Sequence, residues 1–189
     1  APQTLRQTHM KITKKSDLRT VASIVCDCLL KNGIDAVLSG GAVVSIYTNN
    51  EYESKDLDFI SSNRVREIEK ALSEIGFTKT SSRHFIHPKT EFFVEFPKPP
   101  LAIGNLAIKK WVVQDNKAGK LQLLSPTHSI MDRLAGYFYW NDKQNLDQAL
   151  MIAKNHPINL REIESWAKNE NELEKFEVFR TKLLHHKKE

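Results

Sequence analysis

The sequence predicts a mixed α/β (α+β) protein, in which a mixed sheet flanked by helices is followed by a small C-terminal helical subdomain. Two observations support this class. Up to Leu124, short strand-like apolar runs alternate with helical stripes of apolar residues. After Ser125-Pro126, the apolar residues recur with a helical period to the end of the chain. A length of 189 residues suits one compact domain, or a domain with a helical appendage.

The composition is that of an ordinary globular protein. Hydrophobic residues make up 40% of the chain and charged residues 27%, and no apolar run is long enough to span a membrane. The formal net charge of +5 is compatible with a polyanionic partner. Cys26 and Cys28 are two residues apart in a helical pattern, so they point in different directions. We therefore expect reduced thiols and a cytoplasmic location.

Three segments are predicted along the chain. Residues 1–9 show no periodicity, and His9-Met10 is typical of a cloning junction, so this segment is predicted to be an expression leader. Residues 10–124 form the predicted α/β domain, and residues 125–189 form the predicted helical subdomain.

The elements of the α/β domain follow from local patterns. Ser16 is the expected N-cap of a first helix that ends at Gly33, and residues 34–40 form a short strand. We expect a brief helix over 42–48, a strand over 56–62 and a helical stripe from Val65 to Ile75 that Gly76 closes.

The remaining elements are two strand pairs and four helices. Residues 82–87 and 91–96 flank Pro88-Lys89 as a hairpin, and residues 106–115 and 120–125 flank a second turn. The last helices are expected near 127–140, 143–155, 159–168 and 171–185, and an apolar stripe marks the buried side of the last one: Leu173, Phe176, Phe179 and Leu183.

A glycine pair, Gly40-Gly41, follows the first strand and precedes a helix. Glycine there lets a ligand approach the backbone, and the free N–H groups of a helix N-terminus can bind phosphate. The alternative is a tight turn that requires positive φ. The pair matches neither GxGxxG nor the GK[ST] ending of a P-loop.

Three carboxylates mark the predicted strands. Asp56 and Asp58 are two residues apart in one strand, so both face the same side, while Leu57 and Phe59 face inward. Glu95 interrupts an otherwise apolar strand, where an acid is costly unless it is paired or bound to a metal. If the two strands are neighbours, the three acids suit Mg²⁺ or Mn²⁺. The alternatives are a solvated sheet edge or structural ion pairs with lysines such as Lys55.

The stretches "LSGG", "DLDF" and "VEF" together resemble the nucleotidyltransferase fold of the polymerase-β superfamily. The spacer from Ala42 to Lys55 has 14 residues, slightly more than is usual in that pattern, and the third acid is Glu where Asp is commoner. The segment "LSPTHSIMDRLAGYFYWND" is similar to the helix after the catalytic half of small bacterial nucleotidyltransferases, which include AbiEii-type toxins of toxin–antitoxin systems.

The resemblance implies a function for each of these residues. Residues 10–124 would be the nucleotidyltransferase catalytic domain, in which the catalytic metal ligands are Asp56, Asp58 and Glu95. Four further residues would bind the NTP substrate: Ser39, Gly40, Gly41 and Arg133. The reaction would move an NMP to a hydroxyl acceptor and release pyrophosphate.

The acceptor expected first is RNA, in particular a tRNA end, because of the basic charge; a protein or small-molecule hydroxyl comes next. An antitoxin is a possible protein partner. The alternative is a non-catalytic nucleotide-binding or interaction module that retains the fold. Trp140 shares a helical stripe with Arg133, so it is expected either to stack on a base or to pack against the catalytic half.

Overall fold

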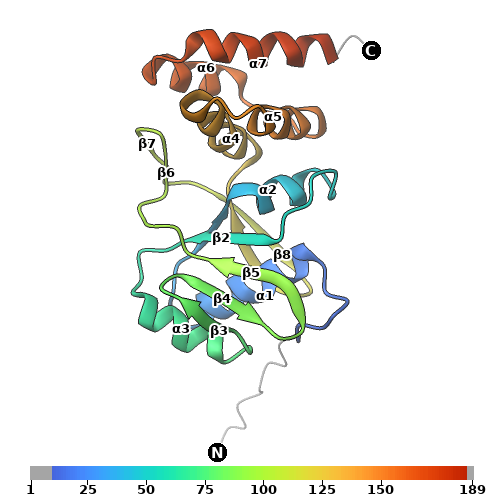
Figure 1. The fold of residues 1–189 in the computed structure, drawn as a ribbon, viewed down its shortest axis with the longest axis vertical. Coiled ribbons are helices and arrows are strands. Elements are labelled where there is room, and N and C mark those ends of the chain that lie inside the picture. The colour runs from blue at the N-terminus through green and yellow to red at the C-terminus, as the bar shows by residue number, and fades with distance from the viewer. Residues whose placement is uncertain (1–9, 187–189) are drawn as a thin grey trace, which may run out of the picture.

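The computed structural model describes residues 10–186. Figure 1 shows a twisted sheet with helices α1 and α3 in one half of the molecule and helices α4 to α7 stacked in the other. The helices are α1 (Leu18–Lys31), α2 (Gly40–Tyr47), α3 (Val65–Ser73), α4 (Pro126–Trp140), α5 (Lys143–Asn155), α6 (Leu160–Asn169) and α7 (Leu173–His186). The strands are β1 (Val37–Ser39), β2 (Asp56–Ile60), β3 (Thr78–Ser81), β4 (His84–His87), β5 (Thr90–Glu95), β6 (Ala102–Ile103), β7 (Leu106–Ala107), β8 (Val112–Asn116) and β9 (Gly119–Leu123).

The main sheet is mixed. Within the described residues its strand order is β3-β4-β5-β2-β1-β9-β8, and β6 and β7 form a separate small hairpin. Strand β2 is antiparallel to β1 and parallel to β5, while β1 is parallel to β9. The predicted fold class is therefore confirmed, and the two acid-bearing strands, β2 and β5, are neighbours.

One face of the sheet is covered by the core. The side chains of Leu57, Phe59 and Val94 are fully buried, in one apolar cluster with residues of α1 and α3 such as Val25 and Leu72. Because strand side chains alternate, the polar residues of β2 lie on the opposite face. That face carries Asp56 and Asp58, which are not buried in the core.

Two details at the N-terminal side differ from the prediction. Asp17, and not Ser16, caps α1, because its carboxylate accepts the Thr20 amide at 2.9 Å, whereas the Ser16 hydroxyl accepts the Thr13 amide. Helix α1 ends at Lys31 with Asn32 as its C-cap, so the predicted stop at Gly33 is slightly late.

The strand region is more divided than expected. Strand β3 was not predicted because Thr78–Ser81 is wholly exposed and lacks apolar alternation. The predicted strand over 106–115 is two strands, since β7 pairs with β6 and β8 pairs with β9. The predicted hairpin around Pro88-Lys89 is confirmed as β4 and β5.

The helical part begins where it was predicted. Strand β9 ends at Leu123 and α4 begins at Pro126. Ser125 is the N-cap of α4, and its hydroxyl accepts a hydrogen bond from the His128 amide. Phe176, Phe179 and Leu183 are buried as expected, but Leu173 is 38% exposed because it opens the helix. One apolar cluster includes residues of both parts, so their independence as domains stays a prediction.

Both cysteines are free, as predicted, and both are buried. The Cys26 thiol is directed at the Ala36 carbonyl and the Cys28 thiol at the Ala71 carbonyl, and burial raises both pKa values to about 11. Within residues 10–186, none of the helices is both long and apolar enough to cross a membrane. The predicted leader, residues 1–9, lies outside the described residues.

Candidate active site

The sheet register brings the predicted acids to one face. Asp58 is the register partner of Glu95 on the parallel strand β5 and of Ser39 on the antiparallel strand β1. Neighbouring strands are about 4.8 Å apart, so these side chains lie side by side. Asp56 points to the same face two residues earlier, and Leu57 between them is fully buried on the other face. The condition set in the sequence analysis, that the two acid-bearing strands are neighbours, is thus fulfilled.

Gly40 provides the space for the Asp58 carboxylate. Its φ is +70°, and a Cβ built at this position would lie 2.6 Å from Asp58 Oδ2. Glycine is therefore required here both for its backbone conformation and for the close approach. The other carboxylate oxygen, Asp58 Oδ1, is buried and has no hydrogen-bond partner. A buried, unpartnered carboxylate oxygen is costly and is an expected ligand for a cation.

The electrostatics of the site also favour a cation. Burial raises the pKa of Asp58 to about 6, and the nearby Glu95 and Asp56 carboxylates add to the shift, which Arg133 partly opposes. The pKa of Asp56 is raised as well, by burial first and then by Glu95. Both shifts arise because negative charge is concentrated in a partly desolvated place, and a bound divalent cation would relieve it.

Glu95 has a partner that the sequence did not reveal. His84 on β4 is its register partner on the other side, and His84 Nδ1 lies 2.9 Å from Glu95 Oε1. The imidazole also stacks on Phe93, with ring centroids 4.6 Å apart. The register of the β4–β5 hairpin thus places the His84 ring beside the third acid.

A cleft of about 280 Å³ opens beside Asp58. Four of the predicted site residues line it: Ser39, Gly40, Asp58 and Arg133. The opposite wall comes from the segment between β5 and β6, including Lys98, and from β6 itself. The remaining predicted residues, Gly41, Asp56 and Glu95, are not part of its lining. The Ser39 hydroxyl donates to the Asp58 carbonyl at 3.2 Å, and Gly41 packs closely against the ring of Tyr52.

Arg133 reaches the cleft from α4. Its guanidinium donates to Asp132 Oδ2 at 2.8 Å, to Asn145 Oδ1 at 3.2 Å and to Gln148 Oε1 at 3.4 Å. Its Nε is buried and has no partner. The side chain is thus on the cleft side of the helix and not on the solvent side, with one donor in reserve for an anion.

The carboxylates of the site fit a divalent cation that is bound together with substrate phosphates. Among residues 10–186, no three His, Cys, Asp or Glu side chains form a ready-made metal-binding cluster. Mg²⁺ is typically held by one or two carboxylates together with substrate phosphates and waters. Asp58 Oδ1 and the neighbouring Asp56 match that requirement, so the cation and the phosphates would bind together.

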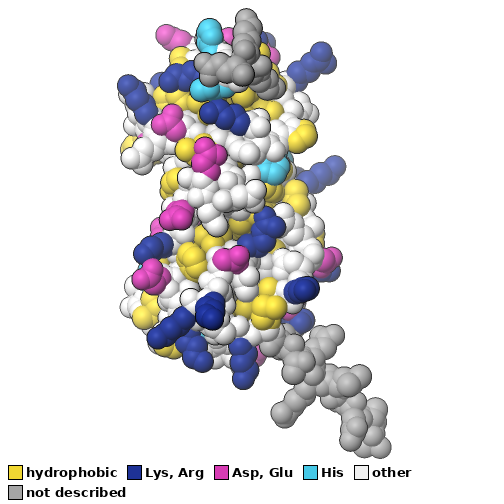
Figure 2. Space-filling model, turned by 90° about the vertical axis from the view of Figure 1, so that its right-hand side faces the viewer, with side chains coloured by type: hydrophobic (Ala, Val, Ile, Leu, Met, Phe, Trp, Pro, Cys, Tyr) yellow, Lys and Arg dark blue, Asp and Glu magenta, His cyan; other side chains and the backbone are white. Residues whose placement is uncertain are grey.

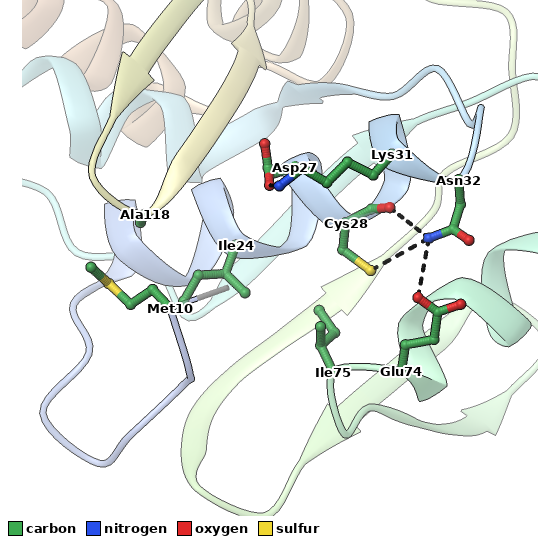
Figure 3. A pocket seen from close by; sticks show the side chains of 9 residues that line it. All are labelled: Met10, Ile24, Asp27, Cys28, Lys31, Asn32, Glu74, Ile75 and Ala118. Carbon is green, nitrogen blue, oxygen red and sulfur yellow. Dashed lines mark hydrogen bonds and ion pairs between the residues drawn. The ribbon is translucent and has the colours of Figure 1, made fainter. Parts of the chain in front are cut away.

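Another pocket lies elsewhere and shares no residue with this site. It is formed around α1 and the end of α3, and Figure 3 shows the Asn32 amide donating to the Cys28 carbonyl and to Glu74 Oε2 within it. The Asn32 amide, the Cys28 carbonyl and the Glu74 carboxylate are hydrogen-bonded to one another there. The pocket contains none of the predicted site residues. We therefore place the candidate site at Asp58.

Sequence reasoning missed two residues near the site and misjudged a third. Asp132 contacts Gly40 and His84 contacts Glu95, and both contacts depend on tertiary pairings. For Asp132, the signal in the sequence was its position directly before Arg133. Trp140 does not pack against the catalytic half as expected, since its side chain is 84% exposed, and its stacking on a base stays a prediction. Tyr137, one turn earlier, is the buried aromatic of that helix face.

Comparisons with known proteins agree on the fold. No protein-family model matches the chain, and no curated protein is significantly similar to it in sequence. An antigenic nucleotidyltransferase-like protein from Paracoccidioides brasiliensis is similar in structure, with a TM-score of 0.55 and 15% identity over 75% of this chain and 78% of that one. The antibiotic-resistance factor ANT(2'')-Ia gives a TM-score of 0.51 and 12% identity over 89% of this chain and 95% of that one. The chain therefore has the nucleotidyltransferase fold.

Proposed function

We propose that the protein is a metal-dependent nucleotidyltransferase that moves an NMP from an NTP to a hydroxyl acceptor. The observation that carries this proposal is the buried, unpartnered Asp58 Oδ1, set against Gly40 at the start of α2 and beside Glu95. The nucleotidyltransferase fold supports the reaction class. A structural role for the acids is less well supported, since the buried Asp58 Oδ1 has no hydrogen-bond partner.

Several residues of the chain would bind the triphosphate together. The phosphates would bind at the start of α2, at the positive end of the helix and at the Gly40 N–H, which donates to Asp132 Oδ2 in this structure. Arg133 and Lys98, which line the same cleft, supply positive charge from the other walls. Asp56 and Asp58 would hold Mg²⁺ or Mn²⁺, which supplies charge neutralisation on the phosphates and polarises the α-phosphoryl group.

Glu95 would act as the general base for the acceptor hydroxyl. It lies beside Asp58 on the neighbouring strand, and His84 Nδ1 at 2.9 Å orients its carboxylate. It would accept the proton of the acceptor hydroxyl as that oxygen attacks the α-phosphorus in line. The new O–P bond forms, the bond from the α-phosphorus to its bridging oxygen breaks, and pyrophosphate leaves. Glu95 would in addition contribute to the metal site.

The acceptor is proposed on weaker grounds. The net charge of +5 supports RNA, with a tRNA end first, although basic and acidic side chains are interspersed on the face shown in Figure 2. A protein hydroxyl remains a candidate, and the likeness to an antibiotic-resistance factor supports a small molecule. Kinship with AbiEii-type toxins and an antitoxin partner stay predictions from the sequence alone.

The experiment that tests the proposal is transfer of α-labelled NTPs. Each of the four NTPs is incubated with the protein and Mg²⁺ or Mn²⁺, in turn with total RNA, total protein and a set of aminoglycosides. Label on one class of acceptor, with pyrophosphate released in equal amount, supports the proposal and identifies the base and the acceptor. Binding of an NTP with Mg²⁺ but no transfer to any pool would instead favour the non-catalytic nucleotide-binding module.

A further inference from the structure

Asp132 occupies the place where the candidate site would receive a phosphate. The backbone N–H of Gly40, the first residue of α2, donates to Asp132 Oδ2 at 3.3 Å. A helix N-terminus attracts anions through its free N–H groups and its dipole. In this structure the anion there is the carboxylate of a residue on α4.

The same carboxylate oxygen also engages the second phosphate-binding group. Asp132 Oδ2 accepts from the Arg133 guanidinium at 2.8 Å, and both side chains are largely shielded from solvent. Arg133 is further held by Asn145 and Gln148 on α5, so its position does not depend on Asp132 alone. Asp132 therefore lies between two groups that would otherwise be available to a triphosphate.

The charge of Asp132 is unfavourable for the rest of the site. It adds to the negative charge around Asp58, which also contains Asp56 and Glu95, and it contributes to the raised pKa of Asp58. The Asp132 carboxylate is thus a like charge for Asp58, and it is held in this place by the Gly40 amide and the Arg133 guanidinium.

We propose that Asp132 sets the affinity for NTP by competing with the phosphates for the Gly40 amide and the Arg133 guanidinium. The inference rests on the proposed function and deepens it. When an NTP binds, the Asp132 carboxylate leaves Gly40, and the phosphates take over both donors. Because Gly40 begins α2 and Asp132 lies on α4, the same exchange breaks a contact between the α/β part and the helical part.

A positioning role makes the opposite prediction. If Asp132 only holds Arg133 in place for the phosphates, its replacement weakens NTP binding. If it competes with them, its replacement strengthens binding, because a negative charge next to the triphosphate is removed and two donors are released. The sign of the change in affinity therefore separates the two roles.

The test is calorimetric titration of the full chain with each NTP in the presence of Mg²⁺. The variants are Asp132→Asn and Asp132→Ser, which remove the charge with different side-chain lengths, so that one serves if the other does not fold. Asp147→Asn is the matched control, because Asp147 is an exposed acid on α5. Thermal unfolding without ligand verifies that each variant is folded.

We expect the parent to bind at least one NTP, and the Asp132 variants to bind it about tenfold more tightly, with Asp147→Asn unchanged. Equal or weaker binding by the Asp132 variants, with the parent binding normally, would overturn the inference and leave the proposed function standing. Absence of NTP binding by every protein in the series would overturn the proposed function, and the inference with it.

Discussion

Asp58 and Glu95 lie side by side on the parallel strands β2 and β5, as partners in the register of the sheet. Within residues 10–186, neither forms an ion pair with a lysine or arginine: Glu95 contacts His84, and Asp58 Oδ1 has no hydrogen-bond partner. Two neighbouring acids that stay without a strong cationic partner store unfavourable electrostatic energy. A divalent cation bound together with the phosphates of NTP would release it.

Replacement of Asp58 by asparagine should stabilise the protein without ligand. The pKa of Asp58 is raised to about 6, so its ionisation costs the folded state free energy above that pH. We expect a gain of about 1–3 kcal/mol in the free energy of unfolding of Asp58→Asn at pH 7.5, because each pKa unit corresponds to about 1.4 kcal/mol. Urea denaturation at pH 7.5 and pH 4.5 measures it.

The pH dependence of that gain has a definite sign. As the pH falls from 6 towards 4, Asp58 becomes protonated in the folded state of the parent and the penalty disappears, so the gain must shrink at pH 4.5. A destabilised Asp58→Asn protein at pH 7.5 would mean that the Asp58 charge is compensated within the fold.

Gly40 should be sensitive to substitution for two separate reasons. Its φ of +70° disfavours any side chain, and a Cβ would approach Asp58 Oδ2 within 2.6 Å. Gly33 is the matched control, since its φ is +71° and a Cβ there would meet nothing within 4 Å. Left-handed backbone costs a residue with a side chain about 1–2 kcal/mol, so Gly33→Ala should lose that much.

Gly40→Ala should lose clearly more stability than Gly33→Ala, and it should also lose NTP binding because Asp58 is displaced. Chemical denaturation of both variants gives the difference in stability, and titration with Mg²⁺ and NTP gives the difference in binding. Equal losses of stability, with NTP binding intact in both variants, would show that Gly40 is only a turn residue.

The cation and the nucleotide should bind as a pair. Because no three acidic, histidine or cysteine side chains of residues 10–186 form a ready metal cluster, the phosphates must complete the coordination. Mg²⁺ together with NTP should therefore raise the melting temperature. At a free NTP concentration of 100 times Kd, binding adds about 2.7 kcal/mol to the free energy of unfolding. NTP in the presence of EDTA, or Mg²⁺ alone, should give little change.

Acidification should weaken this combined binding. Asp58 must be ionised to hold the cation, so the stabilisation should decline as the pH falls below about 6, the value to which burial raises the pKa of Asp58. Thermal shifts at a series of pH values measure this decline. Stabilisation by NTP that is independent of Mg²⁺ and of pH would indicate binding elsewhere on the chain.

The sequence predicted the parts of the site that depend on local pattern. The alternation of Asp56, Leu57 and Asp58 determines which side chains face the core, and the glycine pair marks the start of α2. Glu95 was found because an acid in an apolar strand is unusual.

The parts that were missed depend on tertiary pairings. His84 meets Glu95 through the register of a bulged hairpin, and Asp132 meets Gly40 across 92 positions of sequence. The exposure of Trp140 at the end of α4 depends on which helices surround it, which the periodicity of one helix does not determine.

The most direct measurement is the rate of label transfer from an α-labelled NTP by the parent and by four single variants. Asp56→Asn, Asp58→Asn and Glu95→Gln remove the proposed catalytic charges one at a time. Glu91→Gln is the control, because Glu91 lies on the same strand as Glu95 but is exposed and paired with Lys55 at 2.8 Å. We predict that each of the first three lowers the rate about 100-fold or more, while Glu91→Gln keeps the parent rate. Transfer that survives in Asp58→Asn at the parent rate would contradict the account.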